Sequence, residues 1–135
     1  MSPENLIVRR ARPEDDVAIG ELLVDSFIST YARKLPEVVY DDERKAALRA
    51  VAQKRAGAFV WVAELEGRVV GTVALYPPGA DGSEAWLPGA ADLRHLAIHP
   101  DLQGKGLSRP LLDAAEQHAV EQGIETICLH VRRQV

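Results

Sequence analysis

The chain has 135 residues, a formal net charge of −4 and a hydrophobic fraction of 47 %. This length corresponds to one domain, and this composition is typical of soluble globular proteins and excludes a disordered or collagen-like chain. The basic residues form no stripe, so nucleic acid is not expected as a partner. No apolar run approaches the roughly 18 residues that span a bilayer, and residues 1–10 lack the apolar core of a signal peptide. We therefore expect a single domain over residues 1–135 that works in the cytoplasm, away from membranes.

The use of cysteine and histidine argues against a metal centre. Cys128 is the only cysteine, so the chain cannot form an internal disulfide, and a cysteine-based zinc site is not expected. The spacing of the histidines matches no metal-ligand motif; they are His95, His99, His118 and His130. We expect no metal cofactor, and we expect Cys128 to be a buried, small apolar side chain.

The first half of the chain predicts a strand followed by two helices. Residues 6–8 favour a strand. Residues 12–16 indicate a helix start, because a proline lies in the first turn and acidic residues lie at the positive end of the helix dipole. Apolar residues then recur at helical spacing; they are Ile19, Leu22, Leu23 and Phe27. A second helix is predicted over residues 36–55.

The second half of the chain predicts strands and one long helix. Residues 58–63 and 69–76 are almost continuously apolar, and they are joined by a turn in which Gly67 can take a positive φ. Strands of this composition are covered on both faces. A loop rich in proline and glycine follows over residues 77–89. The remaining elements are a strand over 93–98, an amphipathic helix over 107–122 that Gly123 ends, and a strand over 125–131.

The order of these elements, β-α-α-β-β-β-α-β, defines the fold class. The hairpin requires antiparallel strands, whereas the final strand–helix–strand unit needs a crossover and therefore parallel strands. We predict an α/β (α+β) domain with a mixed central sheet and helices on both faces.

The segment that carries chemistry lies between the strand over 93–98 and the helix after it. Glycines at this position let the backbone approach a ligand closely, and the first N–H groups of the helix favour an anion such as a pyrophosphate. Lys105 and Arg109 could add charge-assisted contacts. The Walker A pattern fails because no Ser or Thr follows Lys105, and the dinucleotide pattern fails because Arg109 stands where its third glycine should be. The pattern that remains consists of Gln103, Gly106 and Ser108.

Residues 93–116, together with the opening at 7–16 and the hairpin at 62–73, resemble the GNAT superfamily of acetyl-CoA-dependent N-acetyltransferases. The resemblance implies the GNAT-like acyl-CoA N-acyltransferase fold and acetyl-CoA as co-substrate. It implies that backbone groups meet the pantetheine arm at Leu96, Ala97 and Ile98. It also implies a pyrophosphate cradle of backbone N–H groups at Gln103, Gly104, Lys105, Gly106, Leu107 and Ser108, where Ser108 replaces the usual glycine or alanine.

The resemblance also implies the reaction, which is transfer of the acetyl group to a primary amine of a small molecule or peptide by direct attack in a ternary complex. Asp92 lies where some family members carry a general base, and Glu84 is a second candidate for that role. The acceptor would enter over residues 26–40 and 77–91, where Tyr31, Tyr40 and Trp86 could line its path, although packing is the more ordinary role of such side chains.

The end of the sequence departs from the family pattern. Members continue past the last predicted strand with a further helix and two strands, whereas this sequence ends at Val135. The alternative hypothesis is therefore a partial domain of weak or absent activity that binds CoA or serves as a dimerising regulatory module. The exposed edge of the strand over 125–131 would then pair with a second copy in a homodimer.

Overall fold

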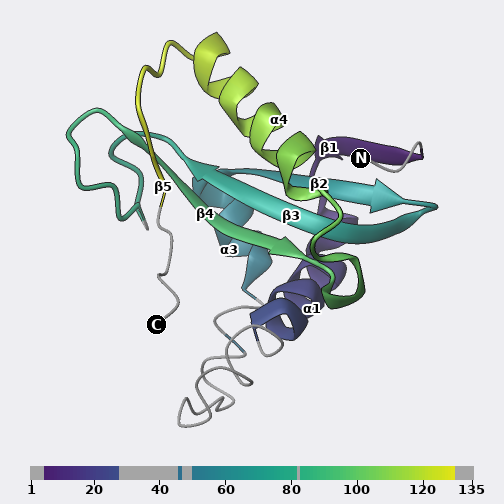
Figure 1. Cartoon of the computed structure of the whole chain (residues 1–135). Helices are drawn as coiled ribbons and strands as arrows, with labels where there is room; N and C mark the ends of the chain where they lie inside the picture. Colours follow the sequence, from purple (N-terminus) through teal and green to yellow (C-terminus); the bar gives the residue numbers. More distant parts are fainter. Residues whose placement is uncertain (1–4, 28–45, 47–49, 82, 130–135) are drawn as a thin grey trace, which may run out of the picture.

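A computed structural model describes residues 5–27, 46, 50–81 and 83–129 of the chain (Figure 1). Its described strands form a five-stranded sheet in chain order. These strands are β1 (Leu6–Arg10), β2 (Phe59–Leu65), β3 (Arg68–Tyr76), β4 (Ala91–Ile98) and β5 (Ile127–Leu129). Neighbours from β1 to β4 are antiparallel, and β5 runs parallel to β4. The predicted mixed sheet is confirmed.

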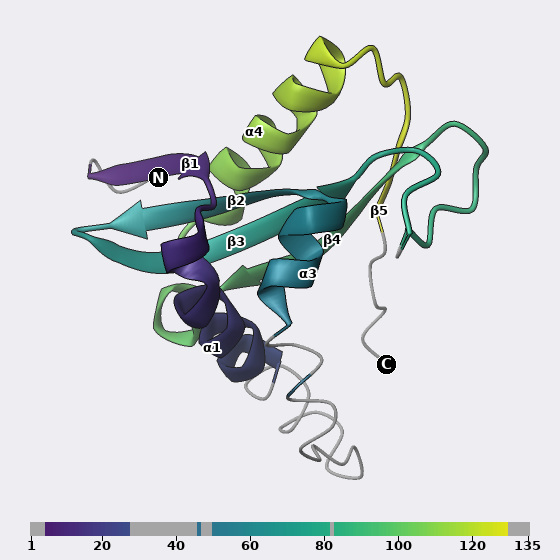
Figure 2. The ribbon, with the colours of Figure 1, turned by 180° about the vertical axis from the view of Figure 1, so that it is seen from behind.

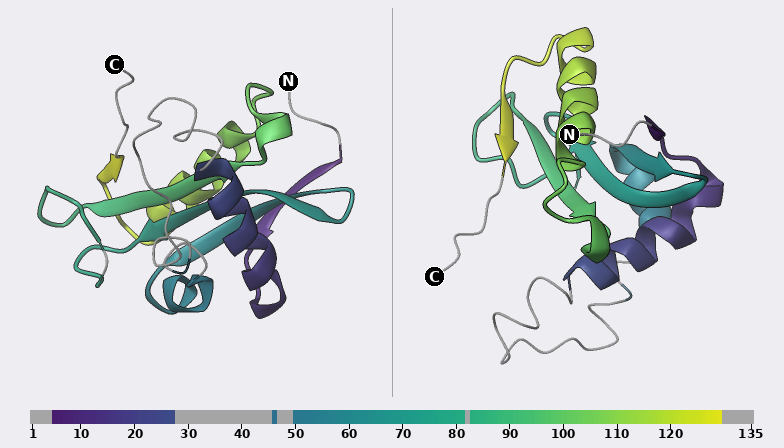
Figure 3. Two further views of the ribbon diagram at one scale, coloured as in Figure 1. Left: turned by 90° about the horizontal axis from the view of Figure 1, so that it is seen from below. Right: turned by 45° about the vertical axis from the view of Figure 1, so that its right-hand side comes forward.

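The helices lie on both faces of this sheet, as predicted. Helix α4 (Ser108–Glu121) covers one face, and α1 (Asp16–Phe27) and α3 (Val51–Gly57) cover the other (Figures 1 and 2). The two views in Figure 3 separate the helices in the same way. A 3₁₀ turn with proline at its first position precedes α1, which places the helix start where the sequence predicts it. Of the predicted helix over 36–55, the end is found in α3, and most of the rest lies outside the described residues.

Alternation along the strands divides the buried side chains into two clusters. The cluster under α4 includes Trp61, Ala63, Val73, Leu75, Leu93, Leu107, Leu111, Ala115 and Ala119. The cluster under α1 and α3 includes Ile19, Leu22, Leu23, Val51, Val60, Val62, Ala74, Tyr76 and Ala97. Because consecutive strand residues point to opposite faces, β2 and β3 contribute to both clusters. The continuously apolar strands are therefore covered on both sides.

The β2–β3 hairpin closes through a two-residue turn. Leu65 pairs with Arg68, and the residues between them, Glu66 and Gly67, have φ angles of 53° and 80°. Two positive φ angles in succession belong to the turn type whose twist matches that of the flanking strands. The predicted role of Gly67 is confirmed, and Glu66 shares the left-handed conformation.

Strand β4 contains a bulge that the sequence did not predict. Ala74 pairs with Arg94 and Thr72 pairs with Ala97, so two residues of β4, His95 and Leu96, stand opposite Val73 alone. His95 has a φ of 59°, a left-handed value that is uncommon for a residue with a side chain. The extra residue reverses the alternation. Leu93 therefore lies in the α4 cluster and Ala97 in the opposite one.

The ends of the sheet differ slightly from the prediction. Strand β4 begins at Ala91, two residues before the predicted start, and so includes Asp92. Strand β5 begins at Ile127, and residues 130–131 of its predicted extent lie outside the described residues. Cys128 in β5 is buried, as predicted.

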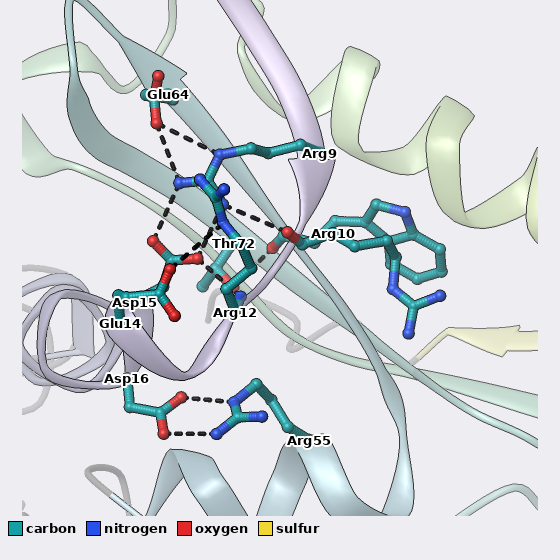
Figure 4. Close-up of polar contacts among 10 residues, drawn as sticks. Arg9, Arg10, Arg12, Glu14, Asp15, Asp16, Arg55, Glu64 and Thr72 are labelled. Atoms are coloured by element: carbon teal, nitrogen blue, oxygen red, sulfur yellow. Dashed lines mark hydrogen bonds and ion pairs between the residues drawn. The ribbon is translucent and has the colours of Figure 1, made fainter.

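A network of ion pairs fixes the entry into α1 (Figure 4). The Arg9 guanidinium of β1 donates to both carboxylate oxygens of Asp15, at 2.8 and 3.0 Å, and to Oε1 of Glu64 in β2, at 3.0 Å. Asp15 also accepts the Arg12 backbone N–H at 2.8 Å. Arg9 holds the pKa of Asp15 below its ordinary value of 3.8. In the same figure Asp16 of α1 accepts from Arg55 of α3, so the two helices are joined as well.

We expect Asp15→Asn to lower the free energy of unfolding by about 2 kcal/mol at neutral pH, because the change weakens charged hydrogen bonds at a nearly buried site. Chemical denaturation measures this difference. The matched change Glu14→Gln, at an exposed neighbour, should stay within about 0.5 kcal/mol.

The same pair of proteins gives a pH test. A carboxylate with a depressed folded-state pKa stabilises the fold above its unfolded value and loses this contribution as the pH falls through the folded value. Wild type and Asp15→Asn should therefore converge in stability below about pH 3.8. A difference that stays constant into that acidic range would contradict the assignment.

Candidate active site

The glycine-containing loop joins the end of β4 to the start of α4. It contains a 3₁₀ turn at Pro100–Leu102, and then Gly104 and Gly106 take φ angles of 80° and 78°. A Cβ at Gly104 would meet nothing within 4 Å, so the conformation rather than crowding requires glycine there. Residues 103–106 are exposed, and α4 begins at Ser108. The first N–H groups of a helix have no partner within it, so this loop presents donors to solvent.

Side-chain hydrogen bonds hold the loop to the end of β4 and within itself. The Gln103 side-chain amide donates to the Ile98 carbonyl at 3.3 Å, and the His99 ring accepts the Asp101 backbone N–H at 3.2 Å. Gln103 therefore supports the loop from within the predicted cradle. Lys105 is exposed within the loop, whereas the Arg109 guanidinium pairs with Asp113 of the same helix at 3.1 Å. Lys105 and Arg109 are the two side chains predicted to contact the anion. The Arg109 side chain already forms an ion pair within α4.

Leu96, Ala97 and Ile98 follow the bulge at the end of β4. Ala97 and Ile98 rejoin the ladder with β3, and Leu96 is 40 % exposed. The described residues of β5 pair only with Ala91–Leu93, so they do not reach this end of β4. The structure therefore brings the predicted backbone contacts of Leu96–Ile98 and the glycine loop to one end of the same strand.

The two predicted carboxylates lie together around Arg94. Asp92 is 0 % exposed, and its Oδ2 accepts the backbone N–H of Glu84 at 2.6 Å. The Glu84 side chain is 62 % exposed, and its Oε1 lies 3.4 Å from Nη2 of Arg94. Nε of Arg94 also lies 3.9 Å from Oδ2 of Asp92. Asp92 thus anchors the loop before β4, and Glu84 presents its carboxylate to solvent from that loop.

Further polar groups lie beside the bulge, and sequence reasoning did not select them. The Tyr76 hydroxyl of β3 lies 3.3 Å from Nε2 of His95, and the two rings meet edge to face at 5.9 Å. Arg94 lies over the Tyr76 ring at 5.8 Å. Burial, reinforced by the charges of Lys54 and Arg94, lowers the pKa of His95 to about 4. Burial also lowers the pKa of Lys54 and raises that of Tyr76.

No signal in the sequence could have grouped these residues. Tyr76, His95 and Lys54 come from β3, β4 and α3, and their meeting depends on the register of β4 against β3 and on the packing of α3. Only the position of His95 next to Leu96 was visible beforehand.

The predicted acceptor region is described in part. The loop before β4 borders a hollow of about 410 Å³, and Trp86, which is 61 % exposed, is among its lining residues. Tyr31 and Tyr40 lie outside the described residues. In the part of the chain that the structure covers, no group of His, Cys, Asp or Glu is arranged to hold a metal ion. Among the helices of those same residues, none has the length and apolarity needed to cross a membrane.

The sequence was compared with models of known protein families and with curated proteins. Residues 17–134 match the family described as the acetyltransferase (GNAT) family. No curated protein matches the chain at a significant level.

Solved structures with the same fold are similar to this one at low sequence identity. A GNAT family acetyltransferase from Brucella melitensis in complex with acetyl-CoA has a TM-score of 0.70 and 22 % identity, over 95 % of this chain and 77 % of that one. The PaiA N-acetyltransferase from Thermoplasma acidophilum in complex with coenzyme A has a TM-score of 0.70 and 21 % identity, over 99 % and 82 %. A predicted acetyltransferase from Clostridium acetobutylicum with acetyl-CoA has a TM-score of 0.69 and 19 % identity, over 95 % and 82 %.

We expect Asp92→Ala to release the loop before β4. The change removes a charged acceptor from the Glu84 N–H, and such hydrogen bonds contribute about 1.5–3 kcal/mol. Hydrogen exchange of the Glu84 amide should therefore accelerate by about 10-fold or more. Asp81 is an exposed residue of the same loop, so Asp81→Ala should leave the exchange rate of the Glu84 amide unaltered. Equal protection in wild type and Asp92→Ala would show that the bond does not hold the loop.

Proposed function

The chain belongs to the GNAT family of acetyltransferases, and on that premise we propose that it moves the acetyl group of acetyl-CoA to a primary amine. The observation that carries the proposal is the bulge near the end of β4, which is followed by a glycine loop and a helix N-terminus. At the bulge, backbone groups are released from the hydrogen-bond ladder of the sheet. At the glycine loop and the helix N-terminus, backbone N–H groups favour a bound anion. Acetyl-CoA carries both a thioester and a pyrophosphate, so it can use both.

The glycine loop binds the pyrophosphate in this proposal. Backbone N–H groups from Gln103 to Ser108 face the phosphate oxygens, and the left-handed φ angles of Gly104 and Gly106 let the chain turn there without a side chain in the way. Lys105 adds positive charge from an exposed position. Similar structures from Brucella and Thermoplasma that contain acetyl-CoA and coenzyme A support this choice of ligand.

The bulge supplies the groups that activate the thioester. A bulged residue is left out of the hydrogen-bond ladder, so backbone groups at the start of Leu96–Ile98 can turn toward a ligand. An N–H aimed at the thioester oxygen stabilises the negative charge that develops when an amine attacks the carbonyl carbon. The bond between that carbon and sulfur then breaks, the sulfur leaves with its electron pair as the CoA thiolate, and the amine nitrogen loses a proton.

We assign the removal of that proton to Glu84. A general base must reach the amine directly or through one water. Asp92 is fully buried and already accepts the Glu84 N–H. We therefore assign it the role of holding the loop before β4 in place. The exposed Glu84 carboxylate can meet an acceptor that enters past residues 77–91. A small molecule and a peptide N-terminus are both compatible with this open approach.

Calorimetric titration with acetyl-CoA tests the cofactor site. We expect Gly106→Asp to weaken binding by about 100-fold, because a carboxylate would face the pyrophosphate and the side chain would strain a left-handed position. Gly123→Asp is the matched control, since Gly123 has a φ of 74° at the other end of the same helix. Gly123→Asp should carry the same backbone strain and keep the wild-type affinity for acetyl-CoA.

A folded wild type that binds no acetyl-CoA would overturn the proposed transfer reaction and leave the dimerising module as the alternative. Binding without turnover of any amine in a panel would favour the CoA-binding module. Equal affinity in wild type and Gly106→Asp would place the cofactor elsewhere.

We expect Glu84→Gln to lower kcat/KM by about 100-fold near neutral pH, the size of a general-base contribution. The variant should regain activity as the pH rises, because a larger share of the amine is then already neutral. A pH profile of both proteins measures this, with Glu116→Gln on the exposed side of α4 as control. Parallel profiles for wild type and Glu84→Gln would exclude Glu84 as the base.

A further inference from the structure

The conformation of His95 requires an explanation. Its φ of 59° lies in the left-handed region, which residues with a Cβ occupy at a cost in free energy. Glycine or asparagine would adopt this conformation more readily, and among the residues that the structure describes most of the other left-handed positions are glycines. A strained residue persists where its surroundings hold it, and such residues cluster at functional sites.

Contacts with Tyr76 hold His95 in this position. The Tyr76 hydroxyl and His95 Nε2 lie 3.3 Å apart, and the two rings meet edge to face with centroids 5.9 Å apart. Tyr76 is nearly buried in the cluster under α1 and α3, so its ring is fixed by packing. It also lies three residues along β3 from Val73, the residue opposite the bulge. Tyr76 therefore reaches the bulge residue His95 from the neighbouring strand.

The ionisation of the two side chains is compatible with a neutral hydrogen bond. Burial and the charges of Lys54 and Arg94 lower the pKa of His95 to about 4, so its ring is neutral near pH 7. Burial raises the pKa of Tyr76, so its phenol keeps its proton. A neutral imidazole with its hydrogen on Nδ1 accepts the phenol proton at Nε2. Arg94, over the Tyr76 ring, further restrains that ring.

We propose that Tyr76 and His95 form a clamp that holds the β4 bulge in the geometry in which the backbone of Leu96–Ile98 meets the thioester carbonyl. This inference rests on the function proposed above and adds two positioning residues to it. Neither side chain touches the reacting atoms in this proposal. Both act through the backbone that follows His95.

Infrared spectroscopy of carbonyl-labelled acetyl-CoA tests the clamp directly. A hydrogen bond to the thioester oxygen lowers the carbonyl stretching frequency. Wild type should show this shift, and Tyr76→Phe, which removes only the hydroxyl, should show a smaller one. The variant should lose about 10- to 100-fold in kcat, the cost of a misplaced catalytic group. Its affinity for CoA, which has no carbonyl at this position, should change by less than about twofold.

Thr72→Val is the matched control. Thr72 also lies on β3, and its buried hydroxyl donates to the Trp61 carbonyl on β2, on the side away from the bulge. The change removes a buried hydroxyl from the same strand and should reduce stability alone, with the carbonyl shift and kcat kept. A loss of both in Thr72→Val would assign the Tyr76 effect to general damage of the sheet and overturn the clamp.

His95→Gly and the double variant supply an independent test. Glycine adopts the left-handed conformation freely but has no ring to hold. If the two residues act as one unit, the double variant should be no slower than the slower single variant. Additive losses would show that Tyr76 and His95 act separately and would overturn the clamp.

The outcomes separate this proposal from the proposed function. A carbonyl shift that is equal in wild type and Tyr76→Phe would overturn the clamp and leave the transferase function standing. A wild type that binds no acetyl-CoA would overturn the function and the catalytic part of the clamp together. In that case the exchange rate of the Leu96 amide is compared between ligand-free wild type and Tyr76→Phe. Faster exchange in the variant would show that Tyr76 holds the bulge. An unchanged exchange rate in Tyr76→Phe would overturn the structural role of Tyr76 as well.

Discussion

The bulge in β4 is the constraint on which the rest of the site depends. Two residues of β4 stand opposite one residue of β3, so the strand changes the face to which its side chains point. Before the bulge Leu93 packs under α4, and after it Ala97 packs under α1 and α3. A regular strand would keep both on one face and would continue its ladder with β3 without interruption. The extra residue thus interrupts the ladder where the strand approaches the glycine loop.

The sheet around the bulge is rigid on both sides. Fully buried Leu111 of α4 and Leu107, the residue before that helix, cover one face, and Ile19 of α1 covers the other. Gly71 on β3 lies opposite Ile98, and a Cβ there would come within 3.0 Å of Ile98 and Leu111. The end of β4 is therefore closely packed between β3 and α4. In the proposed mechanism, backbone donors held by such packing stabilise developing charge without reorganising.

Charge distribution divides the region beside β4 into two parts. On the loop side Glu84 and Asp92 surround Arg94, and the carboxylate that remains exposed is that of Glu84. On the bulge side burial, reinforced by the charges of Lys54 and Arg94, lowers the pKa of His95 and keeps its ring neutral near pH 7. Arg94 belongs to both parts, since it pairs with the acidic residues and lies over Tyr76. One side chain of β4 therefore links the loop that presents Glu84 with the residues that hold the bulge.

The sequence by itself determined the order of the elements, because that order is written in local patterns. Apolar runs, the turn at Gly67 and the amphipathic helix after the glycine loop each depend on neighbours only a few residues apart. The same locality made the glycine loop at Gln103–Ser108 recognisable as a candidate pyrophosphate site. The tertiary structure alone decided the register of β4 against β3, and with it the bulge, the burial of Asp92 and the meeting of Tyr76 with His95. Register is set by which side chains fill the space between sheet and helices, and residues from three or more separate segments share that space, so no local pattern records it.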